Sequence, residues 1–357
     1  MRKKRRLKKS VKIFLGIIGI LLSLIIIYKI GTGKVSRKVD IKNIEVEQGE
    51  TYSSIADTLK ENKLIKSKFF YRLYIKFHKS MQLNEGIYEL SGNMNVKTLV
   101  KTLENEVKSN SIIITFKEGI NYSKFTSIIS EKFGFTENEI SEVIGNVNYQ
   151  TELIKKYWFL TDDIKKEGIY YPLEGFLFPD TYHFNKKSSI KQILEKILDN
   201  TESKLNPYKK DIENNKYNIY EIMTMASVVE LEASNSSDRA GVAGVFFNRL
   251  ENGWSLGSDV TTYYGLKLAL TDRDLTTNDL NSDNGYNTRN SKMAGKLPIG
   301  PICMPGLESI KATIDPTKHD YFYFVADKTG KTYFTKTAKA HSAKVSELKK
   351  AGLWIEY

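Results

Sequence analysis

The most restrictive feature of this sequence is an apolar segment near its start. Residues 13–28 read IFLGIIGILLSLIIIY, sixteen consecutive residues without a charge. Val11 and Ile30 extend the segment at its two ends. Lys12 and Lys29 can reach toward the membrane surface with their charges, so the segment provides about 20 residues, enough for a helix to cross ~30 Å of hydrocarbon. The pattern predicts a membrane-spanning helix.

Two other interpretations of the segment fit less well. A buried core helix would not follow a run in which eight of the first twelve residues are Lys or Arg. A cleaved signal peptide has the same order of basic and apolar regions, but this apolar run is long for one and residues 29–34 (KIGTGK) offer no Ala-x-Ala-like site. We therefore expect a basic cytoplasmic tail over residues 1–12, an uncleaved single-pass anchor in the cell membrane over residues 13–31, and the remainder outside the membrane.

The charge of +12 belongs to this N-terminal part of the chain. Residues 1–38 hold twelve of the 54 Lys and Arg residues and no acid, which leaves 42 basic against 42 acidic residues in 39–357. Because counterion release needs clustered cations, we expect no nucleic-acid partner. The single cysteine, Cys303, excludes an intrachain disulfide framework, and the four histidines are scattered. We expect neither a metal nor a cofactor.

A polar linker over residues 32–40 precedes a predicted small domain over residues 41–109. Its elements are an alternating strand over 41–46, a helix that buries Ile55, Ala56 and Leu59, a basic aromatic helix over 66–79, a strand over 86–90 and a helix over 96–104. This strand–helix–helix–strand order resembles a LysM-type module, a fold that binds N-acetylated glycans. A small α+β spacer without a ligand is the other interpretation, and the sequence leaves both open.

Residues 110–357 are predicted to form a mixed α+β domain, so the whole chain is expected to be α+β. Helices are predicted over 190–198, 220–232 and 242–250, and an irregular polar region over 271–304. Residues 320–326 and 331–334 are expected to pair as a hairpin across the turn DKTG. An irregular region of this length is uncommon in a compact domain and is often functional.

The predicted helix over 220–232 (YEIMTMASVVELE) carries two candidate acids. Glu230 shares a face with Met223 and Ala226, and a carboxyl there is desolvated, which raises its pKa toward values useful to a general acid. Glu232 lies on another face, above Val229. Periodicity does not choose between the two, and a helix end at which either glutamate reaches water is the plainer interpretation.

Residues 253–257 (GWSLG) match the G-x-S-x-G pattern of a serine-hydrolase elbow. That elbow needs a strand before the serine and a helix after it. Here a predicted helix over 242–250 precedes Ser255, and residues 258–262 (SDVTT) do not look helical. We therefore assign Ser255 no chemistry.

A set of motifs runs through the chain in a fixed order. They are EGFLFPDTY at 174–182, ASVVELEA at 226–233, DR at 238–239, VAGVFFNRL at 242–250, LGSD at 256–259, YNT at 286–288, LPIGPI at 297–302, PG at 305–306 and YFVA at 323–326. In combination they closely resemble the YceG-like family of endolytic murein transglycosylases, over nearly the whole chain. Val260, Gly285 and Met304 depart from it, standing where the family usually has Pro, Pro and Asn.

The resemblance implies an enzyme that cleaves the MurNAc–GlcNAc β-1,4 bond within a peptidoglycan strand and leaves a 1,6-anhydro-MurNAc end. It implies Glu230 as the catalytic acid, and Asn248, Asp259, Tyr286 and Asn287 as substrate-binding candidates. It implies glycan strands as the substrate, and membrane-bound cell-wall synthases of the elongation and division machinery as partners. The alternative is a non-catalytic glycan-binding scaffold of the same machinery, which the substitutions at Val260 and Met304 keep open.

Overall fold

The computed structural model describes residues 9–47, 49–77, 83–105 and 111–354. The fold is mixed α+β, and it divides into two compact units. The first unit comprises Met1–Ile114 with His183–Ser188, and the second comprises Thr115–Tyr182 with Ser189–Tyr357.

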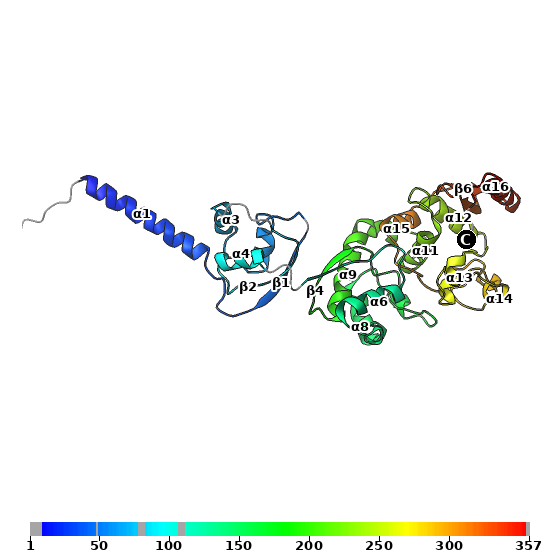
Figure 1. The fold of residues 1–357 in the computed structure, drawn as a ribbon, viewed down its shortest axis with the longest axis horizontal. Helices are drawn as coiled ribbons and strands as arrows, with labels where there is room; N and C mark the ends of the chain where they lie inside the picture. The colour runs from blue at the N-terminus through cyan, green and yellow to red at the C-terminus, as the bar shows by residue number, and fades with distance from the viewer. Residues whose placement is uncertain (1–8, 48, 78–82, 106–110, 355–357) are drawn as a thin grey trace, which may run out of the picture. The chain divides into compact units, whose positions relative to one another are not determined.

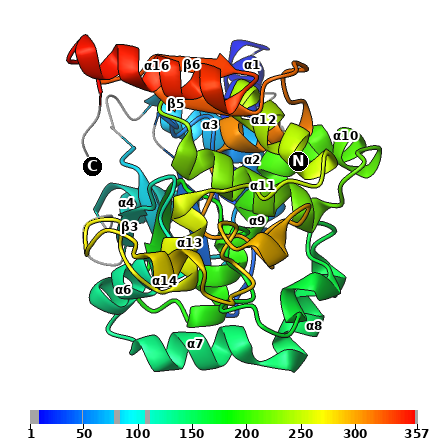
Figure 2. The ribbon, with the colours of Figure 1, turned by 90° about the vertical axis from the view of Figure 1, so that its right-hand side faces the viewer.

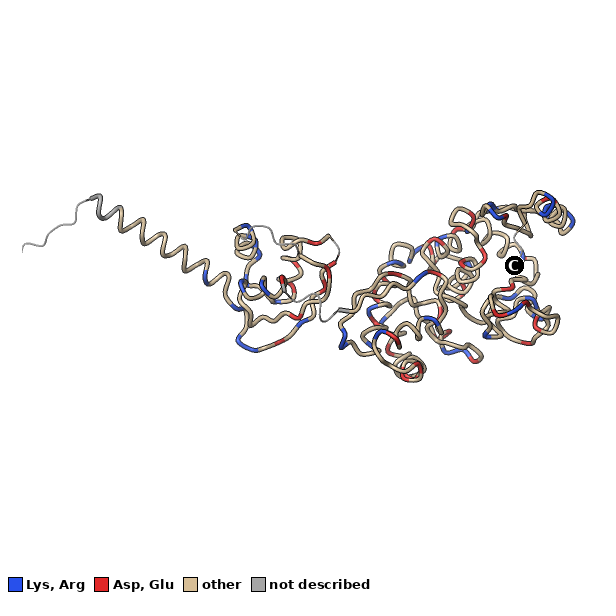
Figure 3. The backbone as a smooth tube through the Cα atoms, in the orientation of Figure 1, with Lys and Arg blue, Asp and Glu red and all other residues tan. Residues whose placement is uncertain are grey.

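Helix α1 (Lys9–Gly31) contains the predicted membrane segment. Its stretch Phe14–Gly31 is long and apolar enough to cross a membrane, with a mean hydropathy of 2.3 and 6% of the stretch buried. Between Lys12 and Lys29 the helix carries no charged side chain (Figure 3). The last turn of α1 packs against α3 (Lys68–Phe77), where the rings of Tyr28 and Phe70 lie 6.2 Å apart.

The core of the first unit is built on an antiparallel strand pair (Figure 1). Strand β1 (Ile41–Val46) pairs with β2 (Gly86–Ser91), in a register that sets Ile41 opposite Ser91 and Val46 opposite Gly86. Helices α2 (Ala56–Glu61), α3 and α4 (Val96–Asn105) supply the rest of its core, which includes Ile55, Leu59, Tyr71, Tyr88 and Leu99.

The order β1–α2–α3–β2 is the one expected from the sequence, although residues 78–79 of the predicted helix 66–79 lie outside the described residues. The likeness to a LysM-type module and its glycan binding stay predictions.

The second unit is mainly helical. Its helices are α6 (Tyr122–Phe133), α7 (Glu137–Gly145), α8 (Val147–Lys156), α9 (Ile190–Leu205), α10 (Lys209–Glu213), α11 (Ile219–Glu232), α12 (Arg239–Glu251), α13 (Asp259–Gly265), α14 (Thr277–Leu280), α15 (Leu307–Ile314) and α16 (Ala338–Lys350). Short 3-10 turns stand at Asp162–Lys165, Asn206–Tyr208 and Ser291–Met293. Strand β5 (Tyr323–Ala326) forms the predicted hairpin with β6 (Thr332–Thr335). A further pair, β3 (Ser111–Thr115) with β4 (Thr181–Asn185), has most of its residues in the first unit.

Helix α11 is the core helix of the second unit (Figure 2). A capping box between Asn218 and Glu221 starts the helix, and apart from Glu221 every residue from Ile219 to Val229 is buried. Helices α12 and α15 pack against it and against each other. The buried part ends one residue before Glu230, so both candidate acids stand in the last turn, where α11 leaves the core.

One local prediction is wrong. Residues 258–262 were expected not to be helical, but Asp259–Gly265 forms α13, with Ser258 at its N-cap. The helix is held by side chains: Thr261 Oγ1 donates to the Ser258 carbonyl at 2.7 Å, and Thr262 Oγ1 donates to Asn287 Oδ1 at 2.7 Å. The local bond of Thr261 and the tertiary bond of Thr262 together outweigh the poor helix propensity of the run Val-Thr-Thr.

Candidate active site

The carboxylate of Glu230 is enclosed by hydrogen-bond donors. Its Oε1 accepts from Nη2 of Arg239, the first residue of α12, at 2.9 Å. Its Oε2 accepts from the Gly306 backbone N–H at 3.0 Å and from the Ser309 hydroxyl at 2.6 Å, both at the start of α15. The Glu230 side chain is only 6% exposed. Glu230 therefore caps the N-terminus of α15, where an anion stabilises the end of a helix. Its contacts also connect α11 with α12 and α15.

Glu118 completes this ionic cluster and was not singled out from the sequence. Its Oε2 lies 3.7 Å from Arg239 Nη2, and its side chain is half exposed. Burial and the nearby charge of Glu230 raise the pKa of Glu118, against the lowering effect of Arg239. A Cβ atom at Gly306 would overlap the Glu118 carboxylate, so a side chain there would displace Glu118 from the cluster.

Glu232 has a different environment. The hydroxyl of Ser258 donates to its Oε1 at 2.5 Å, and Ser258 itself is buried. Burial raises the pKa of Glu232, the hydrogen bond from Ser258 lowers it, and the charge of Asp259 raises it again. Arg289 and Arg249 act in the lowering direction, but the net shift is upward. A raised pKa is what a carboxyl needs to carry a proton at neutral pH.

Asp259 lies beside this acid. Its Oδ1 accepts a 2.5 Å hydrogen bond from Nε of Arg289, and about half of each side chain is exposed. Asp259 is the first residue of α13, directly after the partner of Glu232. Of the four predicted substrate-binding residues, Asp259 is the one whose side chain is exposed next to Glu232.

The other three predicted residues make internal contacts. Asn248 donates through Nδ2 to the carbonyls of His319 and Tyr321, both at 2.9 Å. Asn287 is buried, and its Nδ2 donates to three backbone carbonyls of the segment 279–282. Tyr286 is buried too, and its hydroxyl accepts from the Tyr170 backbone N–H at 3.1 Å. These side chains hold the loops around the site, and their direct contact with substrate stays a prediction.

A second buried acid, Glu174, lies in the EGFLFPDTY motif. Its carboxyl accepts from the Tyr122 backbone N–H at 3.0 Å and from the Tyr264 hydroxyl at 3.0 Å. Burial raises the pKa of Glu174 to about 8, although both hydrogen bonds lower it. In the sequence, the signal for Glu174 was an acid directly before a glycine. In the structure, that glycine, Gly175, has a φ of +83°, which favours glycine.

Ser255 does not lie in an elbow. Helix α12 and a turn precede it, and no strand leads into the serine, so the strand–serine–helix order is missing. Its hydroxyl donates to the Asn290 carbonyl at 3.4 Å. Among the described residues, no group of three His, Cys, Asp or Glu side chains gathers as metal ligands would.

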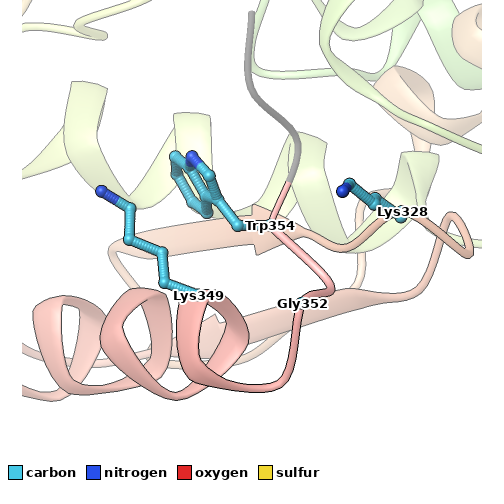
Figure 4. A pocket seen from close by; sticks show the side chains of 4 residues that line it. All are labelled: Lys328, Lys349, Gly352 and Trp354. Atoms are coloured by element: carbon cyan, nitrogen blue, oxygen red, sulfur yellow. The ribbon is translucent and has the colours of Figure 1, made fainter.

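Three cavities of the second unit lie elsewhere. One of about 500 Å³ is lined by Tyr217 and Tyr220 at the start of α11, and one of about 400 Å³ by Tyr208 and Lys311. The third, of about 300 Å³, is lined by Lys328, Lys349, Gly352 and Trp354 (Figure 4). Lys349 Nζ stands 5.0 Å from the centre of the Trp354 ring. Neither Glu230 nor Glu232 lines any of the three.

The sequence profile of the YceG-like family matches residues 44–347. The chain belongs to the YceG-like family. An endolytic murein transglycosylase of Bacillus subtilis (strain 168) is 33% identical over 302 residues, which cover 84% of this chain and 82% of that protein. Another, from Streptococcus pneumoniae serotype 2, is 29% identical over 322 residues, covering 85% of this chain and 58% of that protein. The crystal structure of a YceG-like protein from Listeria monocytogenes aligns with a TM-score of 0.60 and 30% identity, over 86% of this chain and all of that one.

Proposed function

We propose that the protein is a membrane-anchored endolytic transglycosylase that cleaves MurNAc–GlcNAc β-1,4 bonds within nascent peptidoglycan strands, leaves 1,6-anhydro-MurNAc ends and so terminates strand elongation. The observation that carries the proposal is the carboxyl of Glu232, desolvated at the end of a buried helix, with a raised pKa and a hydroxyl partner. The enzyme class rests on the family: the relatives that match share the name endolytic murein transglycosylase, and this chain is a lytic transglycosylase.

One carboxyl suffices for this reaction. Ordinary glycosidases need a second carboxylate, either as the nucleophile or to activate water. In a lytic transglycosylase the nucleophile is the C6 hydroxyl of the same MurNAc ring, which is already held at high effective concentration. A single glutamic acid can protonate the leaving oxygen and then, as carboxylate, accept the proton of O6 while O6 bonds to C1.

The contacts favour Glu232 over Glu230 for this role. Three donors, one of them the Arg239 guanidinium, already bind the Glu230 carboxylate. A proton donor must instead reach the leaving oxygen with a protonated carboxyl. The Glu232 carboxyl has one hydroxyl partner, and burial raises its pKa above that of an ordinary glutamate. We therefore propose Glu232 as the acid. Glu230, which the family resemblance implied as the acid, is proposed to hold the end of α11 in place.

Asp259 and Arg289 provide the polar surface beside the acid. Both side chains are about half exposed, and they form an ion pair with each other. A pair of this kind can offer hydrogen bonds to sugar hydroxyl and acetamide groups on either side of the bond. Asn248, Tyr286 and Asn287 are proposed to act through the loops that they hold.

Helix α1 supports the proposed anchoring, with the basic tail in the cytoplasm and the second unit outside the membrane. Such an anchor would keep the enzyme near newly made strands and their membrane-bound synthases. The first unit is proposed to bind N-acetylated glycans, as its LysM-like element order predicts. A non-catalytic glycan-binding scaffold is the second candidate, and the substitutions at Val260 and Met304 are what favour it.

Mass analysis of the products released from purified glycan strands tests the proposal. Strands ending in 1,6-anhydro-MurNAc would support it. Reducing ends would indicate a hydrolase, and strands left intact by folded protein would indicate the scaffold. Full-length protein in detergent is the material of choice.

A further inference from the structure

One exposed aromatic side chain stands out on the second unit. Among its described residues the exposed large apolar side chains are Val147, Trp254 and Leu270, and Trp254 is the aromatic one, with 42% of its surface exposed. It follows the turn that ends α12, where Gly253 has a φ of +70°. The neighbouring Glu251, Asn252 and Lys296 are exposed and polar. The apolar surface is therefore about one ring wide, much smaller than a protein interface needs.

The indole is held firmly in place. Its ring packs against Phe322, with centroids 4.8 Å apart, and against the edge of Tyr323 at 6.1 Å. The Trp254 backbone N–H donates to the Arg249 carbonyl at 2.8 Å, and its carbonyl accepts from the Gly295 N–H at 2.9 Å. A ring held by neighbouring rings and by its backbone loses little conformational entropy when a ligand covers its exposed face.

Trp254 lies in the same loop as the hydrogen-bond partner of the proposed acid. Trp254 and Ser258, the partner of Glu232, belong to the same loop between α12 and α13 and are four residues apart, so their Cα atoms lie within about 14 Å of each other. Arg249 connects the part of this loop near Ser258 with Phe322, which packs on Trp254. It donates to the Phe322 carbonyl at 2.7 Å and to the Leu256 carbonyl at 2.5 Å, and its charge acts on Glu232.

The segment between them is also fixed. The Gly257 N–H donates to the Thr288 carbonyl at 3.1 Å, and the Ser258 N–H donates to the Thr288 hydroxyl at 3.1 Å. Arg289, the partner of Asp259, comes next in the chain. Trp254, Glu232 and Arg289 therefore border the same two loops.

We propose that Trp254, supported by Phe322, is a stacking platform for a sugar ring of the glycan strand. This sugar lies a few sugar units along the strand from the bond that Glu232 cleaves. The inference rests on the proposed function and adds a subsite to it. A sugar ring presents a face of C–H groups ringed by hydroxyls, and the negative face of an indole attracts such C–H groups while the hydroxyls stay in contact with water. Binding energy from a remote sugar holds the polymer in register across the acid.

Fluorescence of Trp254 tests the proposal directly. The chain has three tryptophans, so Trp158→Phe with Trp354→Phe leaves Trp254 as the one indole. In full-length protein that also carries Glu232→Gln, peptide-free glycan strands should change the Trp254 emission in a saturable way. An unchanged emission at strand concentrations that wild-type enzyme cleaves rapidly would overturn the proposal, and so would a response to phospholipid vesicles but not to strands.

Kinetics supply the second readout. Trp254→Ala in an otherwise wild-type chain should raise KM for long strands about tenfold and change kcat less than twofold, because the stacking contact is made equally in the ground state and in the transition state. Trp254→Tyr should restore most of the affinity. Leu270→Ala, an exposed apolar control, should change neither constant. A Trp254→Ala variant with normal KM, or with kcat and thermal stability lowered together, would contradict the platform.

The two proposals fail in different ways. If wild-type protein releases no anhydro ends, the proposed function fails, whatever Trp254 does. If wild-type protein releases them but neither the emission nor KM depends on Trp254, only the platform fails.

Discussion

The hydroxyl of Ser258 donates a 2.5 Å hydrogen bond to Oε1 of Glu232, from the N-cap of α13 to the last residue of α11. This bond opposes the effect of burial on the same carboxyl. It stabilises the carboxylate that remains after the proton has been given to the leaving oxygen, and it orients the group. Ser258 is thus a positioning residue for the proposed acid.

Ser258→Ala should raise the pKa of Glu232 further, because the removed hydrogen bond favours the ionised form. The alkaline limb of the pH profile of kcat/KM should then move to higher pH, with a lower maximum rate. Ser255→Ala is the matched control and should leave the profile unchanged, since Ser255 contacts only the Asn290 carbonyl at 3.4 Å. An alkaline limb that does not move in Ser258→Ala would argue against Glu232 as the acid.

Removing Glu230 should destabilise the second unit. Glu230→Ala leaves the Arg239 guanidinium, 13% exposed, without its closest counter-charge and leaves α15 without its cap. Breaking such a buried pair costs about 3 kcal/mol of unfolding free energy, or roughly 5–10 °C in Tm. Thermal unfolding of the full chain measures this. Glu230→Gln, which keeps the acceptor for Gly306 and Ser309, should lose less. A Glu230→Ala variant as stable as wild type would refute the structural role.

Glu174 should make the stability depend on pH. Burial raises the pKa of Glu174 to about 8 in the folded protein, from 4.5 for an ordinary glutamate. Between these two pKa values the folded state holds a proton that the unfolded state has released. The free energy of unfolding therefore falls as the pH rises toward 8, by at most about 1.4 kcal/mol per pH unit. Unfolding midpoints measured at pH 5.5 and pH 8 should differ more in wild type than in Glu174→Gln. Equal differences in the two proteins would contradict this account.

The N-terminal segment should stay attached in the mature protein. Residues 29–34 offer no cleavage site, and Phe14–Gly31 is long enough to span a bilayer. Sequencing the mature protein from membranes should find an N-terminus before residue 13. A mature N-terminus within residues 31–36, together with release into the soluble fraction, would show a signal peptide instead.

Local patterns predicted much of the fold, because the patterns that specify these elements are close in the sequence. The alternation over residues 41–46, the apolar helix over 220–232 and the hairpin around DKTG each carry their own signal. Helix α13 carries a misleading one. Its β-branched run Val260–Thr262 has poor helix propensity. The hydroxyl of Thr262 donates to Asn287, which is 25 residues away in the sequence.

The same limit applies to the two glutamates. Periodicity places both on one helix end, but their partners come from elsewhere: Arg239 from α12, Gly306 and Ser309 from α15, and Ser258 from the start of α13. Which carboxyl is held by donors and which is left with a single hydroxyl depends on how the helices pack. That information is absent from the spacing of residues 226–233.

The most direct test of the account compares Glu232→Gln with Glu230→Gln. Both substitutions keep the shape of the side chain and remove its proton-donating carboxyl. Purified full-length variants, checked for folding by thermal unfolding, are incubated with glycan strands, and 1,6-anhydro-MurNAc ends are counted by mass spectrometry. We predict that Glu232→Gln lowers the rate by ~10²–10⁴-fold or more while strands still bind, and that Glu230→Gln keeps a measurable rate with the wild-type pH profile. Near-normal release by Glu232→Gln, with release abolished in a folded Glu230→Gln, would contradict the account and return the acid to Glu230.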